Sequence, residues 1–140
     1  MARKLLILAR EMGIALEEDD IELESLIPSC CEGASSVEEF IAKLPEADAE
    51  FEKTLSTAVN EGKVLRYIAK IESDGKAVVS LQAVDADHPF YSLSGSDNII
   101  SFVTKRYLDR PLVVKGPGAG VDVTAAGVFA DLVRVGTYLL

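Results

Sequence analysis

The pattern of apolar and polar positions changes from a helical period to a strand period near residue 63. Helices are expected over residues 1–12, 35–45 and 46–61. Five strands are expected over residues 64–72, 77–84, 90–93, 99–107 and 111–114, with a further short extended segment at 21–26. Helices that precede the strands, instead of alternating with them, predict an α+β fold with a mainly antiparallel sheet of about five strands and helices on one face.

Local signals support several of these elements. Asp74-Gly75 is a strong hairpin signal between the first two of the five strands. Ser36 and Glu39 have the spacing of a capping box at the start of the second helix. In the third helix, the residues expected to face inward are Ala47, Phe51, Leu55, Ala58 and Val59. The first helix has no capping side chain, since Met1 and Ala2 supply none.

The last thirty residues hold a strand (111–114), a turn with alternating glycines and a long apolar helix (121–140). The three glycines of the turn are Gly116, Gly118 and Gly120. Without a Cβ, their backbone N–H groups can approach a ligand closely, at the positive end of a helix. The turn therefore suits an anion or a flat polar ring, although the spacing alone favours the simpler interpretation of a tight strand-to-helix connection.

The helix over residues 121–140 is apolar on more than one side, so we expect it to be buried on more than one side. Its length approaches that of a membrane span. Its three charged residues, Asp122, Asp131 and Arg134, argue against a span and favour a core or inter-domain helix. A domain of this size would not bury the helix fully, which predicts a missing partner.

Composition narrows the function classes. A chain of 140 residues with 49% apolar residues is expected to form one globular domain with a real core. The net charge is −9, and residues 1–62 hold 5 basic and 15 acidic residues, which disfavours nucleic acid as a partner. No signal peptide or transmembrane pattern is visible, so neither a membrane partner nor export is expected.

The few cysteine and histidine residues further narrow the compartment and the kinds of site that are expected. Cys30 and Cys31 are adjacent, which is poor geometry for a disulfide, and favour a reduced, cytoplasmic setting. With His88 as the only histidine, no zinc site can be assembled, and no metal is expected. His88 precedes Pro89 in a loop and is expected to be structural.

Lys4 stands in the first turn of the first helix. Its ammonium group faces the positive end of the helix dipole, which disfavours the charged form of the side chain. A lysine so placed can donate or accept a proton or orient a substrate oxygen. The simpler interpretation is a solvated surface lysine, and position alone leaves both open.

The segment GPGAGVDVTAAGVFADL (116–132) resembles the C-terminal signature of homoserine dehydrogenases. Met1-Ala2-Arg3-Lys4 is similar to the end of that family's D-x-x-x-K signature, and LLILAREMG (5–13) looks most like the bifunctional aspartokinase/homoserine dehydrogenases. The resemblance implies interconversion of L-homoserine and L-aspartate 4-semialdehyde with NADP or NAD, in threonine and methionine biosynthesis. It also implies that Lys4 is the catalytic lysine and that Gly118 and Gly120 approach the nicotinamide. Thr124, in the first turn of the last helix, could hydrogen-bond nearby backbone or a ligand, and its simpler role is a local cap.

The resemblance further implies an incomplete enzyme. Residues 1–120 would form the C-terminal part of the substrate and dimerisation domain. Residues 121–140 would return to pack on a Rossmann domain that the chain lacks, and the family's aspartate partner of Lys4 would lie just before Met1. We therefore expect an inactive isolated chain and a homodimer or higher oligomer formed through the sheet.

Two other functions fit the residues. A standalone module could hold a small anion at the glycine turn, in which case the isolated chain would bind anions and bury its last helix. A purely structural dimerisation domain would form a stable oligomer without a ligand.

Overall fold

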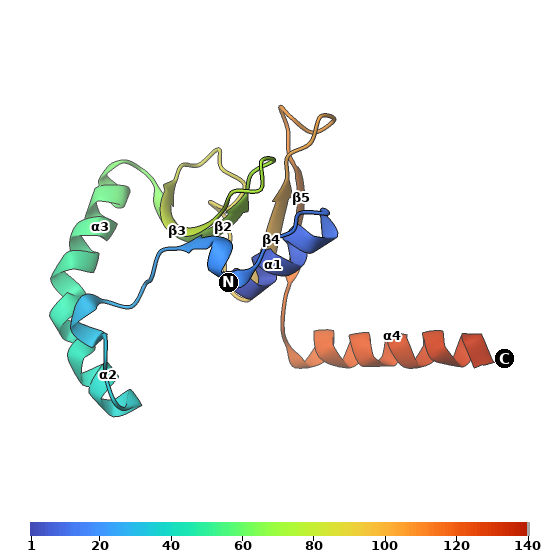
Figure 1. The fold of residues 1–140 in the computed structure, drawn as a ribbon, viewed down its shortest axis with the longest axis horizontal. Coiled ribbons are helices and arrows are strands. Elements are labelled where there is room, and N and C mark those ends of the chain that lie inside the picture. Colours follow the sequence, from blue (N-terminus) through green and yellow to red (C-terminus); the bar gives the residue numbers. More distant parts are fainter. Residues whose placement is uncertain (140) are drawn as a thin grey trace. The chain divides into compact units, whose positions relative to one another are not determined.

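The computed structural model describes residues 1–139, which form two compact units, Met1–Ala86 and the chain from Asp87 onward (Figure 1). Each unit contains its own small sheet. The α+β fold class is thus confirmed. Four of the five expected strands, together with the short extended segment expected at 21–26, form a three-stranded and a two-stranded sheet. The strand expected at 99–107 ends at Phe102.

The first unit contains three helices and three strands. The helices are α1 (Ala2–Glu11), α2 (Val37–Lys43) and α3 (Asp48–Asn60), and the strands are β1 (Ile21–Leu23), β2 (Val64–Ile71) and β3 (Ala77–Val84). Three short 3₁₀ turns lie between them: η1 (Glu18–Asp20), η2 (Ser29–Cys31) and η3 (Leu44–Ala47). All three expected helices and the hairpin β2–β3 are confirmed, with boundaries shifted by a few residues.

The sheet of this unit has the strand order β1-β3-β2. β2 and β3 are antiparallel, whereas β1 runs parallel to β3 with Ile21 opposite Ala77. Leu5 and Ala9 of α1 pack against Ala77 and Val79 of β3 in the main core cluster. Alternate residues of a strand share one face, so α1 covers a single face of this sheet.

The exposed face of α3 corrects part of the sequence analysis. Ala58 and Ala47, the latter at the end of η3, are buried as expected. Phe51, Leu55 and Val59 are instead 41%, 47% and 61% exposed. The reason is that α3 makes its main contacts with η3 and β2, and these contacts do not cover its larger apolar side chains. Phe51 and Leu55 remain open to solvent in a groove that Leu65 of β2 also lines.

The second unit contains β4 (Asp97–Phe102), β5 (Leu112–Pro117) and α4 (Val121–Leu139). The two strands form an antiparallel pair with Asn98 opposite Gly116. The last strand therefore continues through the first glycine of the turn, three residues beyond its expected end.

The strand expected at residues 90–93 is wrong. Its backbone forms turns, in which the Tyr91 N–H donates to the His88 carbonyl at 2.9 Å and the Leu93 N–H donates to that of Phe90 at 3.3 Å. The Phe90 N–H donates to Nδ1 of His88 at 3.1 Å, and the two rings meet edge to face. Local hydrogen bonds beside Pro89 thus satisfy backbone groups that a strand partner would otherwise pair.

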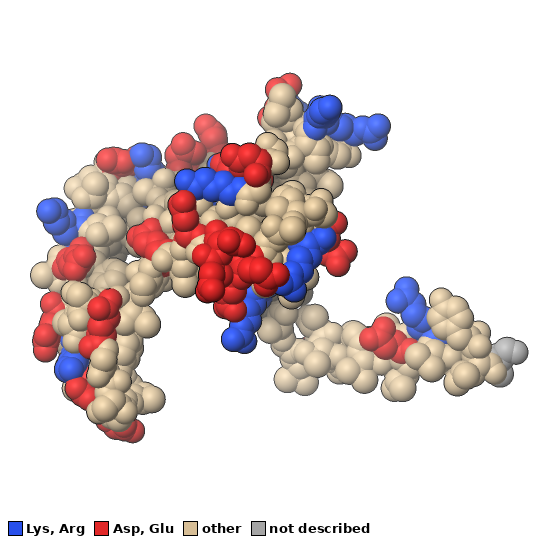
Figure 2. All heavy atoms as spheres, in the orientation of Figure 1, with Lys and Arg blue, Asp and Glu red and all other residues tan. Residues whose placement is uncertain are grey.

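The described part of α4 exposes its apolar side chains to solvent, and none of its residues is buried. Its surface in Figure 2 is mostly free of charged groups. No helix within residues 1–139 is long and apolar enough to cross a membrane.

Candidate functional site

The glycine turn joins β5 to α4. The N–H of Gly118 donates to the carbonyl of Ser96 at 3.2 Å, and the carbonyl of Gly120 accepts the N–H of Thr124 at 3.0 Å to begin the helix. Gly120 has φ +147°, a backbone conformation that side chains with a Cβ rarely adopt. A Cβ placed at Gly116 or at Gly120 would meet no atom within 4 Å. The turn is therefore open at these two glycines.

Gly118 differs, because a side chain already occupies the space beside it. A Cβ at Gly118 would lie 1.1 Å from Nδ2 and 2.4 Å from Cγ of Asn98. The Asn98 carboxamide, which comes from β4, thus lies against the backbone of the turn. No local sequence signal marks Asn98, because its contact with Gly118 depends on the pairing of two strands separated by a loop.

The strand pair is held beside the turn by one lysine. Nζ of Lys115 lies 3.5 Å from Oδ2 of Asp97 and 3.4 Å from the carbonyl of Ser92. Asp97 is paired with Pro117 in the ladder, so this contact links the strand end that carries the turn to the loop before β4.

Thr124 lies in the first turn of α4 and is exposed. Within residues 1–139, its hydroxyl has no hydrogen-bond partner, whereas its backbone N–H is satisfied by Gly120. The hydroxyl therefore caps nothing and remains available to a ligand.

Lys4 is held on a rigid element in the first unit. Its neighbour Leu5 is 3% exposed and anchors α1 in the core, whereas Lys4 itself is exposed. The helix has no acidic residue in its first turn and no side-chain cap, as expected from the sequence. Within the described residues Lys4 forms no ion pair, although Arg3 and Arg10 of the same helix pair with Glu18 and Glu17. The structure thus groups Gly118, Gly120 and Thr124 in the second unit and places Lys4 in the first.

The acidic run Glu17 to Asp20 is organised as a local structure. The Arg10 guanidinium donates to both carboxylate oxygens of Glu17 at 3.0 and 3.1 Å, and the Glu17 N–H donates to Oδ2 of Asp20 at 2.8 Å. Within residues 1–139, no three His, Cys, Asp or Glu side chains are grouped closely enough to hold a metal ion.

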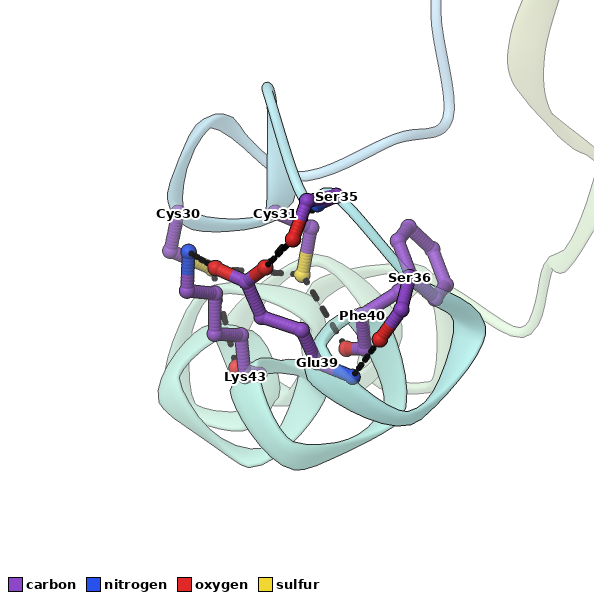
Figure 3. A network of polar contacts seen from close by, with 7 residues as sticks. All are labelled: Cys30, Cys31, Ser35, Ser36, Glu39, Phe40 and Lys43. Atoms are coloured by element: carbon purple, nitrogen blue, oxygen red, sulfur yellow. Dashed lines mark hydrogen bonds and ion pairs between the residues drawn. The ribbon is translucent and has the colours of Figure 1, made fainter.

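A dense polar network lies around α2 (Figure 3). The Glu39 carboxylate accepts from Nζ of Lys43 at 2.7 Å and from the N–H and hydroxyl of Ser35 at 2.9 and 2.7 Å. Donation from Lys43, then from Ser35, holds the pKa of Glu39 at about 2. The Ser36 hydroxyl accepts the Glu39 N–H at 3.2 Å, which confirms Ser36 as the cap, although the carboxylate returns to Ser35 and not to Ser36.

The two cysteines close the other side of this network. Their Sγ atoms are 3.7 Å apart, and both thiols are free. The thiols of Cys30 and Cys31 face the carbonyls of Lys43 and Phe40, each at 3.8 Å. Burial, and then the neighbouring Cys30, raise the pKa of Cys31, which keeps it a neutral thiol.

Comparison with known proteins gives consistent results. The family model described as homoserine dehydrogenase matches residues 1–133. The chain is 48% identical to a bifunctional aspartokinase/homoserine dehydrogenase 2, chloroplastic, of Arabidopsis thaliana, over 99% of the chain and 15% of the relative. It is 47% identical to a homoserine dehydrogenase of Schizosaccharomyces pombe, over 96% of the chain and 36% of the relative.

Solved structures agree with the fold. A Candida auris protein of unknown function superimposes with a TM-score of 0.84 at 42% identity, over 97% of this chain and 38% of that one. The Staphylococcus aureus homoserine dehydrogenase gives a TM-score of 0.63 at 17% identity, over 99% and 30% of the two chains, which shows a shared fold.

The chain spans about 15% of the bifunctional relatives that it matches, and little more than a third of the single-function one. The sequence motifs, the α+β fold and the family match over residues 1–133 lead to one conclusion: the chain belongs to the homoserine dehydrogenase family.

Proposed function

We propose that this chain forms part of the substrate domain of an NAD(P)-dependent homoserine dehydrogenase, which interconverts L-homoserine and L-aspartate 4-semialdehyde. The observation that carries the proposal is the family match, which includes both Lys4 and the glycine turn. On its own the chain is inactive, because nucleotide binding depends on a Rossmann domain that it does not contain. We also propose that the part of the substrate domain in this chain ends at residue 120 and that residues 121–140 pack on the nucleotide-binding domain.

The glycine turn is suited to a nicotinamide cofactor. At Gly120 the backbone is open, since no atom would meet a Cβ there, and α4 supplies the positive end of a long helix beside it. Gly118, Gly120 and the free hydroxyl of Thr124 would hold the nicotinamide end of NAD(P). When bound, the cofactor supplies or accepts the hydride.

Lys4 moves the proton in this proposal. During aldehyde reduction the carbonyl oxygen becomes an alkoxide, and Nζ of Lys4 donates a proton to it; in the reverse direction the amine accepts the hydroxyl proton. The absence of an acidic neighbour in the first turn of α1, and of an ion pair to Lys4 within residues 1–139, leaves Nζ available to substrate. Anchoring by Leu5 fixes the helix that carries it.

Two features of the surface support assembly with partners. The exposed apolar side chains of α4 provide a contact for a nucleotide-binding domain, and those of β4 and β5 provide a contact for a second copy. We propose a homodimer or higher oligomer on this basis. The two free cysteines are consistent with a reducing, cytoplasmic compartment, while the plant relatives are named as chloroplastic.

The test is made in the complete enzyme that carries this chain. Lys4→Ala should lower kcat for aspartate 4-semialdehyde by about 10²–10⁴-fold, the usual contribution of a general acid. Lys53→Ala, at a lysine on α3 remote in sequence from both candidate elements, is the matched control and should keep normal kcat. A near-normal kcat in Lys4→Ala would remove the catalytic role.

The two other functions make different predictions. An anion-binding module requires the isolated chain to bind phosphate at the glycine turn. If the chain is a purely structural domain, it should form an oligomer, and the complete protein should bind no cofactor. Titration of the isolated chain with phosphate, and of the complete enzyme with NADPH, separates the three.

A further inference from the structure

An apolar groove with an acidic rim lies between α3 and β2. Phe51 and Leu55 of α3 line it together with Leu65 of β2, and the two α3 side chains are about half exposed. Asp48 and Glu52 line the same groove, and no lysine or arginine does so. Within residues 1–139 neither carboxylate forms an ion pair. The groove therefore suits a partner that buries apolar side chains and brings positive charge to the rim.

The loop that joins β4 to β5, residues 103–111, has the complementary chemistry. Tyr107 and Leu108 are 39% and 67% exposed. Beside a single carboxylate, that of Asp109, the loop carries three exposed cations, none of which forms an ion pair among the described residues: Lys105, Arg106 and Arg110. Blue side chains mark the end of this loop in Figure 2. The loop thus offers apolar side chains and positive charge together.

A turn shapes the end of this loop. The Tyr107 N–H donates to the carbonyl of Thr104 at 3.1 Å and lies 3.2 Å from its hydroxyl oxygen. Lys105 and Arg106 occupy the two central positions of the turn, where their side chains are exposed. A segment that is already ordered loses less conformational entropy when it docks. The loop is therefore prepared to bind as a unit.

We infer that this loop of one copy docks in the groove between α3 and β2 of a second copy. Tyr107 and Leu108 would cover the apolar side chains of the groove, and the cations would lie at its acidic rim. Charge complementarity favours this occupant, because two grooves that faced each other would bring like carboxylates together. The loop also joins the two strands to which we assign a contact with a second copy. The inference therefore extends the proposed oligomer and does not depend on dehydrogenase activity.

Zero-length cross-linking of the complete enzyme tests this contact. A carbodiimide joins an amine to a carboxylate that touches it, and Lys105 supplies the amine. Two differently tagged copies are co-expressed, one with Lys105→Arg and the other with Asp48→Asn and Glu52→Gln. Neither copy can form this cross-link within itself, since each lacks one of the two reacting groups. In oligomers that carry both tags, mass spectrometry should find Lys105 of one copy joined to Asp48 or Glu52 of the other.

Three controls define the contact. Nζ of Lys115 lies 3.5 Å from Oδ2 of Asp97, so these two residues should be cross-linked in every sample. Phe51→Ala, added to the copy that supplies the groove, should lower the yield of the cross-link between copies about fivefold, the effect of truncating an energetically important interface residue. Ile41→Ala changes a residue that is 60% exposed on α2, outside the groove, and should leave the yield unchanged.

Several results would overturn the inference. One is the absence of the Lys105 cross-link between tagged copies while Lys115 and Asp97 react; another is failure of the two tags to purify together. If Lys105 reacted with Glu52 in the unsubstituted enzyme but not between the tagged copies, the loop would dock within one copy. An unchanged yield in Phe51→Ala would mean that the apolar groove is not the seat. None of these readouts requires activity, so a normal kcat in Lys4→Ala would weaken the proposed function and leave them as they are.

Discussion

Replacing Leu5 by Ala tests how the helix that carries Lys4 is held. Leu5 is 3% exposed and contacts the buried face of β3, so the change removes three carbon atoms from the core of the first unit. At about 0.8 kcal/mol per buried methylene, the transfer loss is about 2.4 kcal/mol. Because a cavity adds to this loss, we expect the free energy of unfolding to fall by about 3 kcal/mol.

Ile7 on the same helix provides the matched control. It is 61% exposed, so Ile7→Ala should change the free energy of unfolding by less than about 0.5 kcal/mol. Urea unfolding of both variants, followed by circular dichroism, measures the difference through the midpoint at a constant m-value. Equal losses in the two variants, or a loss below about 1 kcal/mol in Leu5→Ala, would refute the packing of α1 described above.

Four further predictions concern other parts of the chain. The pKa of Glu39 is lowered to about 2, so the ionised carboxylate stabilises the fold fully above about pH 5, and this stabilisation is lost as the pH falls towards 2. Over that range, the urea midpoint should therefore drop less in Glu39→Gln than in the unsubstituted chain. Gly120→Ala should destabilise the start of α4 by about 1–3 kcal/mol through its positive φ, measured by hydrogen exchange of the first helical turn. Iodoacetamide at pH 8 should label Cys30 before the buried, high-pKa Cys31, whereas in urea the two should react alike, as read by mass spectrometry. The isolated chain should self-associate or lose order at residues 121–140, and sedimentation at several concentrations with hydrogen exchange checks this; a monomer with a well-protected α4 would contradict it.

The sequence predicted correctly the elements that depend only on neighbouring residues. Asp74-Gly75 placed the β2–β3 hairpin, and Ser36 placed the start of α2, because a turn and a cap depend on neighbouring residues only. The helical pattern also located α3, but not how much of it would be buried. Burial of Phe51 depends on the size of its contact with β2, which a sequence period does not specify.

The sequence did not predict contacts between residues that lie far apart along the chain. The parallel pairing of β1 with β3 joins Ile21 to Ala77, and no residue near either strand encodes the other. The contact of Asn98 with Gly118 likewise requires the register of β4 and β5. The glycine spacing drew attention to the turn, while the side chain that fills the space beside it became visible only in three dimensions.

The parallel pairing of β1 and β3 sets an order of folding. The β2–β3 hairpin closes across a few residues, whereas Ile21 and Ala77 are separated by more than fifty. Loop-closure entropy makes the longer connection costlier by about 2 kcal/mol, which predicts that the hairpin forms first and that β1 joins it later. α1 packs on the surface that this hairpin provides, through Leu5 and Ala9. During synthesis, Lys4 therefore acquires its place only after residue 79 has left the ribosome.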